Sequence, residues 1–250
     1  MRRLAIAVTL AVASLGLQLL AQGRGQAPPA QPPPVARVAA PYDITGYWVS
    51  LVTDDWRYRM LTPPKGNADY LPVNAEARRV MGEWDPARDE AAGEACRAYG
   101  AGGVMRLPGR LHITWENDNT LKMDLDAGTQ TRRFQFGAPP AAGEPSWQGS
   151  STARWQLPGA RGRGPATTGQ LVVTTNRLRP GYLRKNGVPY SANAVITEYY
   201  VKIADEGQEY LAVTIMVDDP QYLQLPYIKT YQYKKQPDAA GWNPTSCVAR

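Results

Sequence analysis

The alternation of apolar and polar positions is clearest in residues 110–136, where it predicts two consecutive β-hairpins that share their middle strand. Every second side chain is apolar in residues 110–116, and the same period returns in residues 120–126. A three-residue loop between them brings the two apolar faces together, whereas a shift by one residue would mix the faces. This register predicts that His112 lies opposite Asp124.

The same register puts Glu116 opposite Thr120. For the following turn, two residues at 127–128 would set Lys122 beside Arg133, whereas a longer turn, a three-residue loop, would set Asp124 beside Arg132. Pairing of opposite charges favours the longer turn. We therefore predict a row of polar side chains across three strands, formed by His112, Asp124 and Arg132.

Further segments are rich in β-branched and aromatic residues and are bounded by Gly, Pro, Asp or Asn. These segments are residues 46–53, 147–156, 170–178, 194–203, 210–218 and 228–235. Parallel βαβ architecture is excluded, because the helices that would connect its strands are missing. The sequential hairpins favour a single antiparallel up-and-down β-barrel of about eight to nine strands over a Greek-key sandwich.

One helical insertion is predicted after the first strand. Asn74 has the side chain of an N-cap, and apolar residues at helical spacing follow it to residue 84. Pro86 either ends this helix or begins a second short one.

The N-terminal residues 1–23 have two arginines, an apolar run and then small residues, which is the pattern of a secretory signal peptide. Residues 24–41 are rich in Pro, Ala and Gln and predict a disordered tether, so that the barrel domain would span residues 42–250. We expect a periplasmic or secreted protein with no stable membrane span after cleavage of the signal.

At 250 residues and 43% apolar content, the chain can bury a substantial core. Removal of Arg2 and Arg3 lowers the formal charge from +6 to +4, and no Lys/Arg run indicates a nucleic-acid partner. In an oxidising compartment, Cys96 and Cys247 are a candidate disulfide, with two free thiols as the alternative. One His and two distant Cys do not make a metal site, and no cofactor is expected.

The residues Gly46-Tyr47-Trp48 resemble the opening strand of lipocalins and related calycin barrels, in which the Trp plugs one end of the barrel. Residues 106–116, 126–132, 179–190 and 242–247 resemble a group of exported bacterial proteins without an established activity. This second resemblance implies export.

The polar row is the first candidate for chemistry. A carboxylate beside His112 would hold its tautomer and raise its basicity, and Glu116 on the same face would be its acid/base partner. The predicted catalytic residues are therefore His112, Asp124, Glu116 and Arg132. The alternative is a solvated outer face of the sheet, since such faces carry these residue types.

The second candidate is the loop of residues 177–190, whose cations and aromatic rings suit an anionic or aromatic small molecule at a barrel mouth. The predicted ligand-binding residues are Arg177, Arg179, Tyr182, Arg184 and Lys185, with Trp56 and Tyr58 lining the same mouth. The alternative is a loop in which Arg stacks on Tyr for packing.

Three functions follow from these candidates. The first is an exported binding protein that holds a small aromatic or anionic molecule in a barrel cavity. The second is a cofactor-free hydratase, lyase or isomerase that uses His112 as general acid/base. The third is an envelope interaction protein without a pocket. The sequence leaves open whether the chain is an enzyme, and its oligomeric state.

Overall fold

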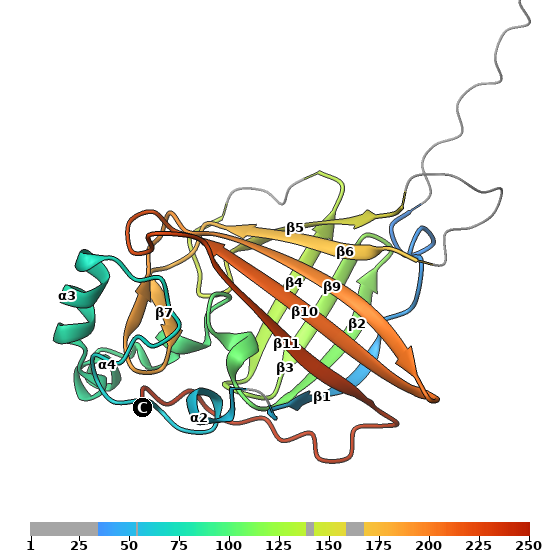
Figure 1. The fold of residues 1–250 in the computed structure, drawn as a ribbon. Helices are drawn as coiled ribbons and strands as arrows, with labels where there is room; N and C mark the ends of the chain where they lie inside the picture. Colours follow the sequence, from blue (N-terminus) through green and yellow to red (C-terminus); the bar gives the residue numbers. More distant parts are fainter. Residues whose placement is uncertain (1–34, 54, 139–142, 159–167) are drawn as a thin grey trace, which may run out of the picture. The chain divides into compact units, whose positions relative to one another are not determined.

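The structure is a computed structural model that describes residues 35–53, 55–138, 143–158 and 168–250. Its compact unit, residues 35–250, is built on a closed β-barrel of nine strands, which confirms the predicted fold class (Figure 1). The predicted signal peptide and the first part of the tether lie outside the described residues. The barrel strands, in chain order, are β1 (Gly46–Leu51), β2 (Arg110–Asn117), β3 (Thr120–Leu125), β4 (Gln130–Phe136), β5 (Ser150–Gln156), β6 (Gln170–Asn176), β9 (Val195–Asp205), β10 (Gln208–Asp218) and β11 (Tyr227–Gln236).

The barrel is mixed rather than purely antiparallel, because β4 and β5 run parallel. Nine strands cannot close into a ring in which every neighbour is antiparallel, since an odd ring leaves two adjacent strands pointing the same way. The connection between β4 and β5 is about a dozen residues long, which is enough to return the chain to the end where β4 began. The closed order is β1-β11-β10-β9-β6-β5-β4-β3-β2.

Short helices and a small hairpin lie at one end of the barrel (Figure 1). They comprise α2 (Trp56–Arg59), α3 (Ala75–Glu83), α4 (Pro86–Ala91), the 3₁₀ helices η1 (Ala95–Tyr99) and η2 (Val104–Arg106), and the hairpin of β7 (Gly181–Arg184) and β8 (Val188–Tyr190). The predicted helix and its cap are confirmed, since the Asn74 side chain accepts a hydrogen bond from the Ala77 N–H at 2.9 Å. Pro86 begins α4, with Asp85 as its N-cap.

The predicted register of the first hairpin is confirmed over most of its length. His112 lies opposite Asp124, and Trp115 lies opposite Leu121. The end of the hairpin differs, because an irregularity between Trp115 and Asn117 places Asn117, not Glu116, opposite Thr120.

The predicted register of the second hairpin is wrong. Lys122 lies beside Arg133, and Asp124 lies beside Thr131. This like-charged pair is tolerated because each cation has its own carboxylate: Lys122 Nζ is 2.9 Å from Asp124, and Arg133 Nε is 2.9 Å from Glu116. Arg132 therefore leaves the polar row and points into the barrel, where its residue is 1% exposed.

Large side chains fill the barrel interior. Trp48 is fully buried, and its indole N–H donates to the Ile44 carbonyl at 3.0 Å. The other largest buried side chains from the barrel strands include Ile113, Leu121, Met123, Arg132, Phe134, Leu171, Tyr200 and Tyr233.

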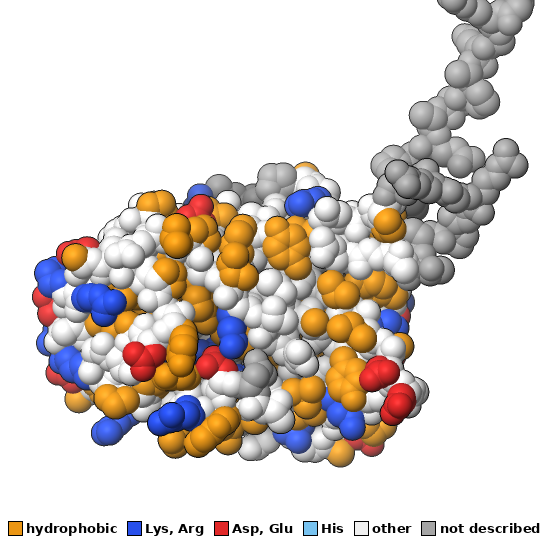
Figure 2. All heavy atoms as spheres, in the orientation of Figure 1, with side chains coloured by type: hydrophobic (Ala, Val, Ile, Leu, Met, Phe, Trp, Pro, Cys, Tyr) orange, Lys and Arg blue, Asp and Glu red, His pale blue; other side chains and the backbone are white. Residues whose placement is uncertain are grey.

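The outer face of β9 and β10 carries little charge. The outward residues in the middle of these strands include Thr197, Tyr199, Val201, Ala212 and Thr214, because their neighbours in sequence are buried. Figure 2 shows few blue or red atoms over this part of the surface. The middle of this face therefore offers no charged group as a candidate for chemistry.

The predicted tether differs from the structure in the part that is described. Residues 35–41 pack against the barrel end opposite the helices, and we call residues 35–45 the strap (Figure 1). The Ala36 N–H donates to the Asn119 side chain at 3.0 Å, and the Arg37 N–H donates to the Asp118 carbonyl at 3.0 Å. The compact unit thus begins at Val35 rather than Tyr42.

Candidate functional site

The predicted acid/base residue, His112, lies on the outer face of the barrel. Its neighbours Leu111 and Ile113 are in the core, so the alternation of the strand turns His112 outward. The imidazole stacks on the Tyr47 ring with centroids 4.0 Å apart, and the Trp242 ring meets it edge-on at 6.2 Å. His112 lines neither of the two pockets described below.

Asp124 is the cross-strand neighbour of His112, but its carboxylate is used elsewhere. It lies 2.9 Å from Lys122 Nζ and accepts a hydrogen bond from the Thr131 hydroxyl at 2.7 Å. Partial burial lowers the pKa of His112 below its usual value; the charge of Asp124 opposes this shift, and Lys122 adds to it. The imidazole is therefore neutral at pH 7. The acid/base role of His112 stays a prediction.

The other two predicted catalytic residues are separated from His112. Glu116 holds the Arg133 guanidinium on the exposed surface. Inside the barrel, Arg132 makes a two-pronged ion pair with Glu198, at 2.8 and 2.5 Å, and both side chains are fully buried. The Arg132 guanidinium also donates to the Thr175 hydroxyl at 3.3 Å, so this part of the core is polar and internally bonded.

The cations that were predicted to bind a ligand stack on aromatic rings of the protein itself. Arg184 lies over Tyr58 at 4.6 Å, and Arg179 lies over Trp147 at 4.0 Å. Lys185 lies over Tyr99 at 5.3 Å. Each of these cations also donates a hydrogen bond within the protein.

The remaining residues of that prediction do not form one site. Arg177 donates to the Gly143 carbonyl, and the Tyr182 hydroxyl donates to Asp89 at 2.9 Å. The Trp56 side chain is exposed on α2.

A row of aromatic rings crosses the barrel end beneath the strap. Trp115 packs on Phe136 with centroids 5.6 Å apart, and Phe136 packs on Trp155 at 5.7 Å. Tyr42 of the strap meets Trp155 edge-on at 5.9 Å. The rings come from β2, β4, β5 and the strap, so only the closed barrel brings them together.

Hydrogen bonds fasten the strap over this row. The Trp155 indole N–H donates to the Ala36 carbonyl at 2.9 Å. The Tyr42 hydroxyl lies within hydrogen-bond distance of the Gly169 and Tyr200 carbonyls, at 3.0 and 3.1 Å. The strap is thus held at both of its ends.

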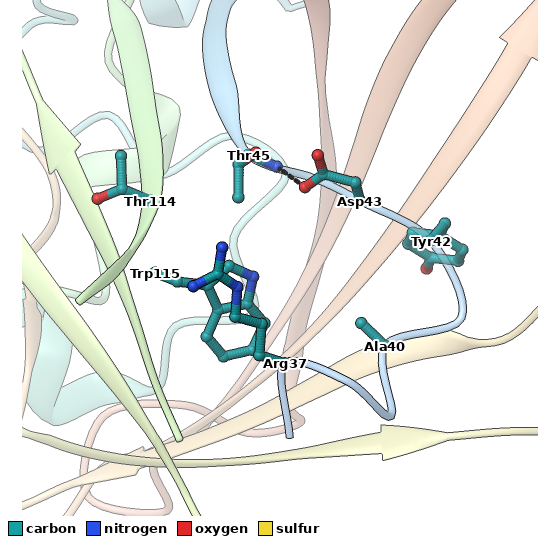
Figure 3. Close-up of a pocket in the computed structure, with 7 residues that line it drawn as sticks. All are labelled: Arg37, Ala40, Tyr42, Asp43, Thr45, Thr114 and Trp115. Atoms are coloured by element: carbon teal, nitrogen blue, oxygen red, sulfur yellow. Dashed lines mark hydrogen bonds between the residues drawn. The ribbon is translucent and has the colours of Figure 1, made fainter. Parts of the chain in front are cut away.

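A pocket of about 410 Å³ lies between the strap and β2, and we call it the strap pocket (Figure 3). It is lined by Arg37, Ala40, Tyr42, Asp43, Thr45, Thr114 and Trp115. In the described part of the chain, the Arg37 guanidinium makes no hydrogen bond or ion pair. A pocket that combines an unengaged cation with an aromatic ring can bind an aromatic anion.

Asp43 brings a negative charge to the same pocket. Its carboxylate accepts the Thr45 N–H at 2.8 Å (Figure 3). Burial by itself would raise the pKa of Asp43, but the hydrogen bonds from Thr45 and the positive charges of Lys235 and Lys202 lower it overall. Asp43 is therefore ionised at neutral pH and would repel an anion while accepting a hydrogen bond from a donor.

The sequence did not reveal the strap pocket, because five of its seven lining residues lie in or beside the segment that composition marks as a tether. The available signal was the change at Val35 from Pro-rich sequence to a mixture of apolar and aromatic residues. Trp115 belongs to the apolar face that the alternation of residues 110–116 predicts, but that pattern does not mark it as part of a pocket.

Two features bear on metal and membrane binding. Within the described ranges, no group of three His, Cys, Asp or Glu side chains is placed to hold a metal ion. None of the helices in those ranges is long and apolar enough to cross a bilayer.

The protein is a mixed nine-strand β-barrel, and the strap covers aromatic side chains at one end of it. No family model matches the chain, and no curated protein or solved structure gives a match. The resemblances to calycin barrels and to exported bacterial proteins stay predictions from the residues quoted above.

Proposed function

We propose that the chain is an exported binding protein for a small aromatic or anionic organic molecule, and that the ligand binds in the strap pocket. The observation that carries the proposal is the unengaged Arg37 guanidinium in a pocket that Trp115 also lines. The pocket volume of about 410 Å³ is within the usual range for small-molecule sites. The barrel interior is a less suitable place, because large side chains fill it.

The disulfide between Cys96 and Cys247 supports export. Disulfides form and persist in oxidising compartments and are rare in the reducing cytosol. A periplasmic or secreted location follows from this argument and from the predicted signal peptide.

The test uses a matched pair of probes, indole-3-acetate and its uncharged amide, with the purified protein and a thermal-shift or calorimetric readout. We expect the carboxylate to bind more tightly than the amide. Arg37→Gln should weaken carboxylate binding by roughly tenfold, because a charge-assisted hydrogen bond is lost, and should remove the preference. Asp43→Asn should strengthen carboxylate binding, because a repulsive charge is removed.

Arg57→Gln is the matched control, since Arg57 is an exposed arginine of α2 that does not line the strap pocket. It should leave both affinities unchanged. The proposal fails if neither probe binds, or if Arg37→Gln keeps the full preference for the carboxylate.

A further inference from the structure

The parallel junction between β4 and β5 is the shortest in the barrel. Only three residue pairs join these strands, from Phe134 with Ser151 to Phe136 with Ala153. Every other pair of neighbouring barrel strands is joined by at least four. Residues 130–133 of β4 therefore extend past the ladder without a strand partner on the β5 side.

A pocket of about 430 Å³ lies where the two strands separate, and we call it the seam pocket. It is lined by Gln130, Thr131, Arg133, Gln135, Ser146, Trp147, Gln148, Gly149, Ser150 and Ser151. Most of these side chains are amides and hydroxyls, which both donate and accept hydrogen bonds. The one charged side chain, Arg133, is held by both carboxylate oxygens of Glu116 at 3.0 and 2.9 Å.

Gln148, which lines the pocket, has a buried side-chain acceptor without a partner among the described residues. Its amide nitrogen donates to the Tyr99 carbonyl at 2.7 Å and to the Gln130 side-chain oxygen at 2.8 Å. These two acceptors fix the orientation of the amide, because a flipped amide would set oxygen against oxygen. The Gln148 Oε1 atom is buried, and it has no hydrogen-bond partner in the part of the chain that the structure describes.

A buried acceptor without a partner requires a donor, since leaving it unpaired is unfavourable. An anion carries no donor for it, whereas a hydroxyl group does. Trp147 adds an aromatic ring to the lining, and the Arg179 guanidinium stacked on it at 4.0 Å holds the ring in place. The lining therefore combines the apolar face of an aromatic ring with amides and hydroxyls that donate and accept hydrogen bonds. Such a lining suits a ligand that has C–H faces and many hydroxyl groups.

The floor of the seam pocket is joined to the polar interior of the barrel. Ser151 lines the pocket, and its hydroxyl lies 2.7 Å from the Thr175 hydroxyl. Thr175 in turn accepts from Arg132, which is paired with Glu198. This network fixes the floor of the pocket from beneath.

We propose that the seam pocket is a second binding site, independent of the strap pocket, and that it takes a neutral saccharide of roughly one or two sugar rings. Sugar hydroxyls match the amides and hydroxyls of the lining. Gln148 Oε1 has no exposed surface in the free protein, so a shift of the Gln148 side chain accompanies binding and lets one sugar hydroxyl donate to it. A C–H face of the sugar rests against Trp147.

The experiment titrates the purified protein with cellobiose, maltose and chitobiose, and follows binding by saturation-transfer NMR and by the indole and amide N–H signals of Trp147 and Gln148. We expect at least one of the three to bind and to shift both signals. Trp147→Ala should weaken binding about tenfold, and Trp147→Phe should restore most of it, because an aromatic face returns. Ser150→Leu, which fills the pocket but keeps Trp147, should also abolish binding.

Trp56→Ala is the matched control, since Trp56 is an exposed tryptophan of α2 outside the seam pocket. Arg37→Gln serves as a second control and should not change saccharide binding, so failure of one site is distinguishable from failure of the other. The proposal is overturned if none of the three sugars binds at millimolar concentration. An affinity that neither Trp147→Ala nor Ser150→Leu lowers overturns it equally.

Discussion

The side chains of Arg132 and Glu198 meet inside the barrel and are both fully buried. Burial by itself would lower the pKa of Arg132, but the charge of Glu198 in contact with it raises the pKa overall. A buried ion pair is often no more stabilising than apolar side chains of the same volume, although removal of one partner is strongly destabilising. The stability of the core therefore depends on the presence of both residues.

We predict that Glu198→Gln lowers the free energy of unfolding by about 3–5 kcal/mol, because it leaves the Arg132 charge buried without its counterion. The double variant Arg132→Met with Glu198→Leu should recover most of this loss, since it removes both charges and keeps the volume. Urea unfolding followed by circular dichroism measures both effects. A Glu198→Gln variant within about 1 kcal/mol of the wild type would contradict this account of the pair.

Sequence reasoning at the residue scale identified His112 and Asp124 as cross-strand neighbours, because alternation and turn length fix that register. It misplaced Arg132, because pairing of unlike charges was used to choose the second turn. That criterion failed since Lys122 and Arg133 each find a carboxylate on their own outer face. The partner of Arg132 is 66 residues further along the chain, and local pattern gives no indication of it.

At the scale of elements, the β7–β8 hairpin has a turn that only glycine fits well. Gly187 has a φ of +83°, and a Cβ atom there would lie 2.3 Å from the Trp84 side chain. Asn186-Gly187 is a turn-forming pair, but no local pattern predicts the strands on each side of it or the contact with Trp84, the C-cap residue of α3.

We predict that Gly187→Ala is more destabilising than Gly207→Ala, which tests this contact. Gly207, in the turn between β9 and β10, has a φ of +78°, and a Cβ atom there would have no neighbour within 4 Å, so its substitution measures backbone strain alone. That strain is about 1–2 kcal/mol, and the clash with Trp84 should add roughly 1–3 kcal/mol at Gly187. Thermal melts of the two variants give the difference; equal losses would show that Trp84 moves aside freely.

The strands themselves were predictable from sequence, since each of the nine barrel strands falls on a segment of β-branched or aromatic residues bounded by turn formers. The strap was not predictable, because its fixed structure depends on hydrogen bonds to distant residues, including Asn119 and Trp155.

At the scale of the whole molecule, the disulfide fixes the C-terminal tail to the helical end of the barrel. The bond joins Cys96 of η1 to Cys247, and the predicted pairing is confirmed. Next to it, the Ala249 N–H donates to Glu90 at 2.7 Å, and Lys185 donates to the Arg250 carbonyl at 2.9 Å. The tail therefore connects α4 and the β7–β8 hairpin as well as η1.

We predict that reduction lowers the free energy of unfolding by about 4–5 kcal/mol, because a loop of 151 residues is opened in the unfolded chain. In a domain of this size, the melting temperature should fall by roughly 10 °C or more. Calorimetry with and without reductant measures the change. The double variant Cys96→Ser with Cys247→Ser is the control, and its melting temperature should be the same with and without reductant. A wild-type protein whose melting temperature is also unchanged by the reductant would contradict the prediction.

The sequence by itself determined the barrel strands, the capped helix, most of the first hairpin and the cysteine pair, because alternation, capping and the number of cysteines are local or compositional properties. Only the tertiary structure decided that β4 and β5 run parallel, since this follows from closing nine strands into a ring. It also decided where the pockets lie. The strap pocket is lined by segments that are distant in sequence, and the seam pocket lies where two neighbouring strands separate. No local sequence pattern indicates which segments lie side by side in the closed barrel.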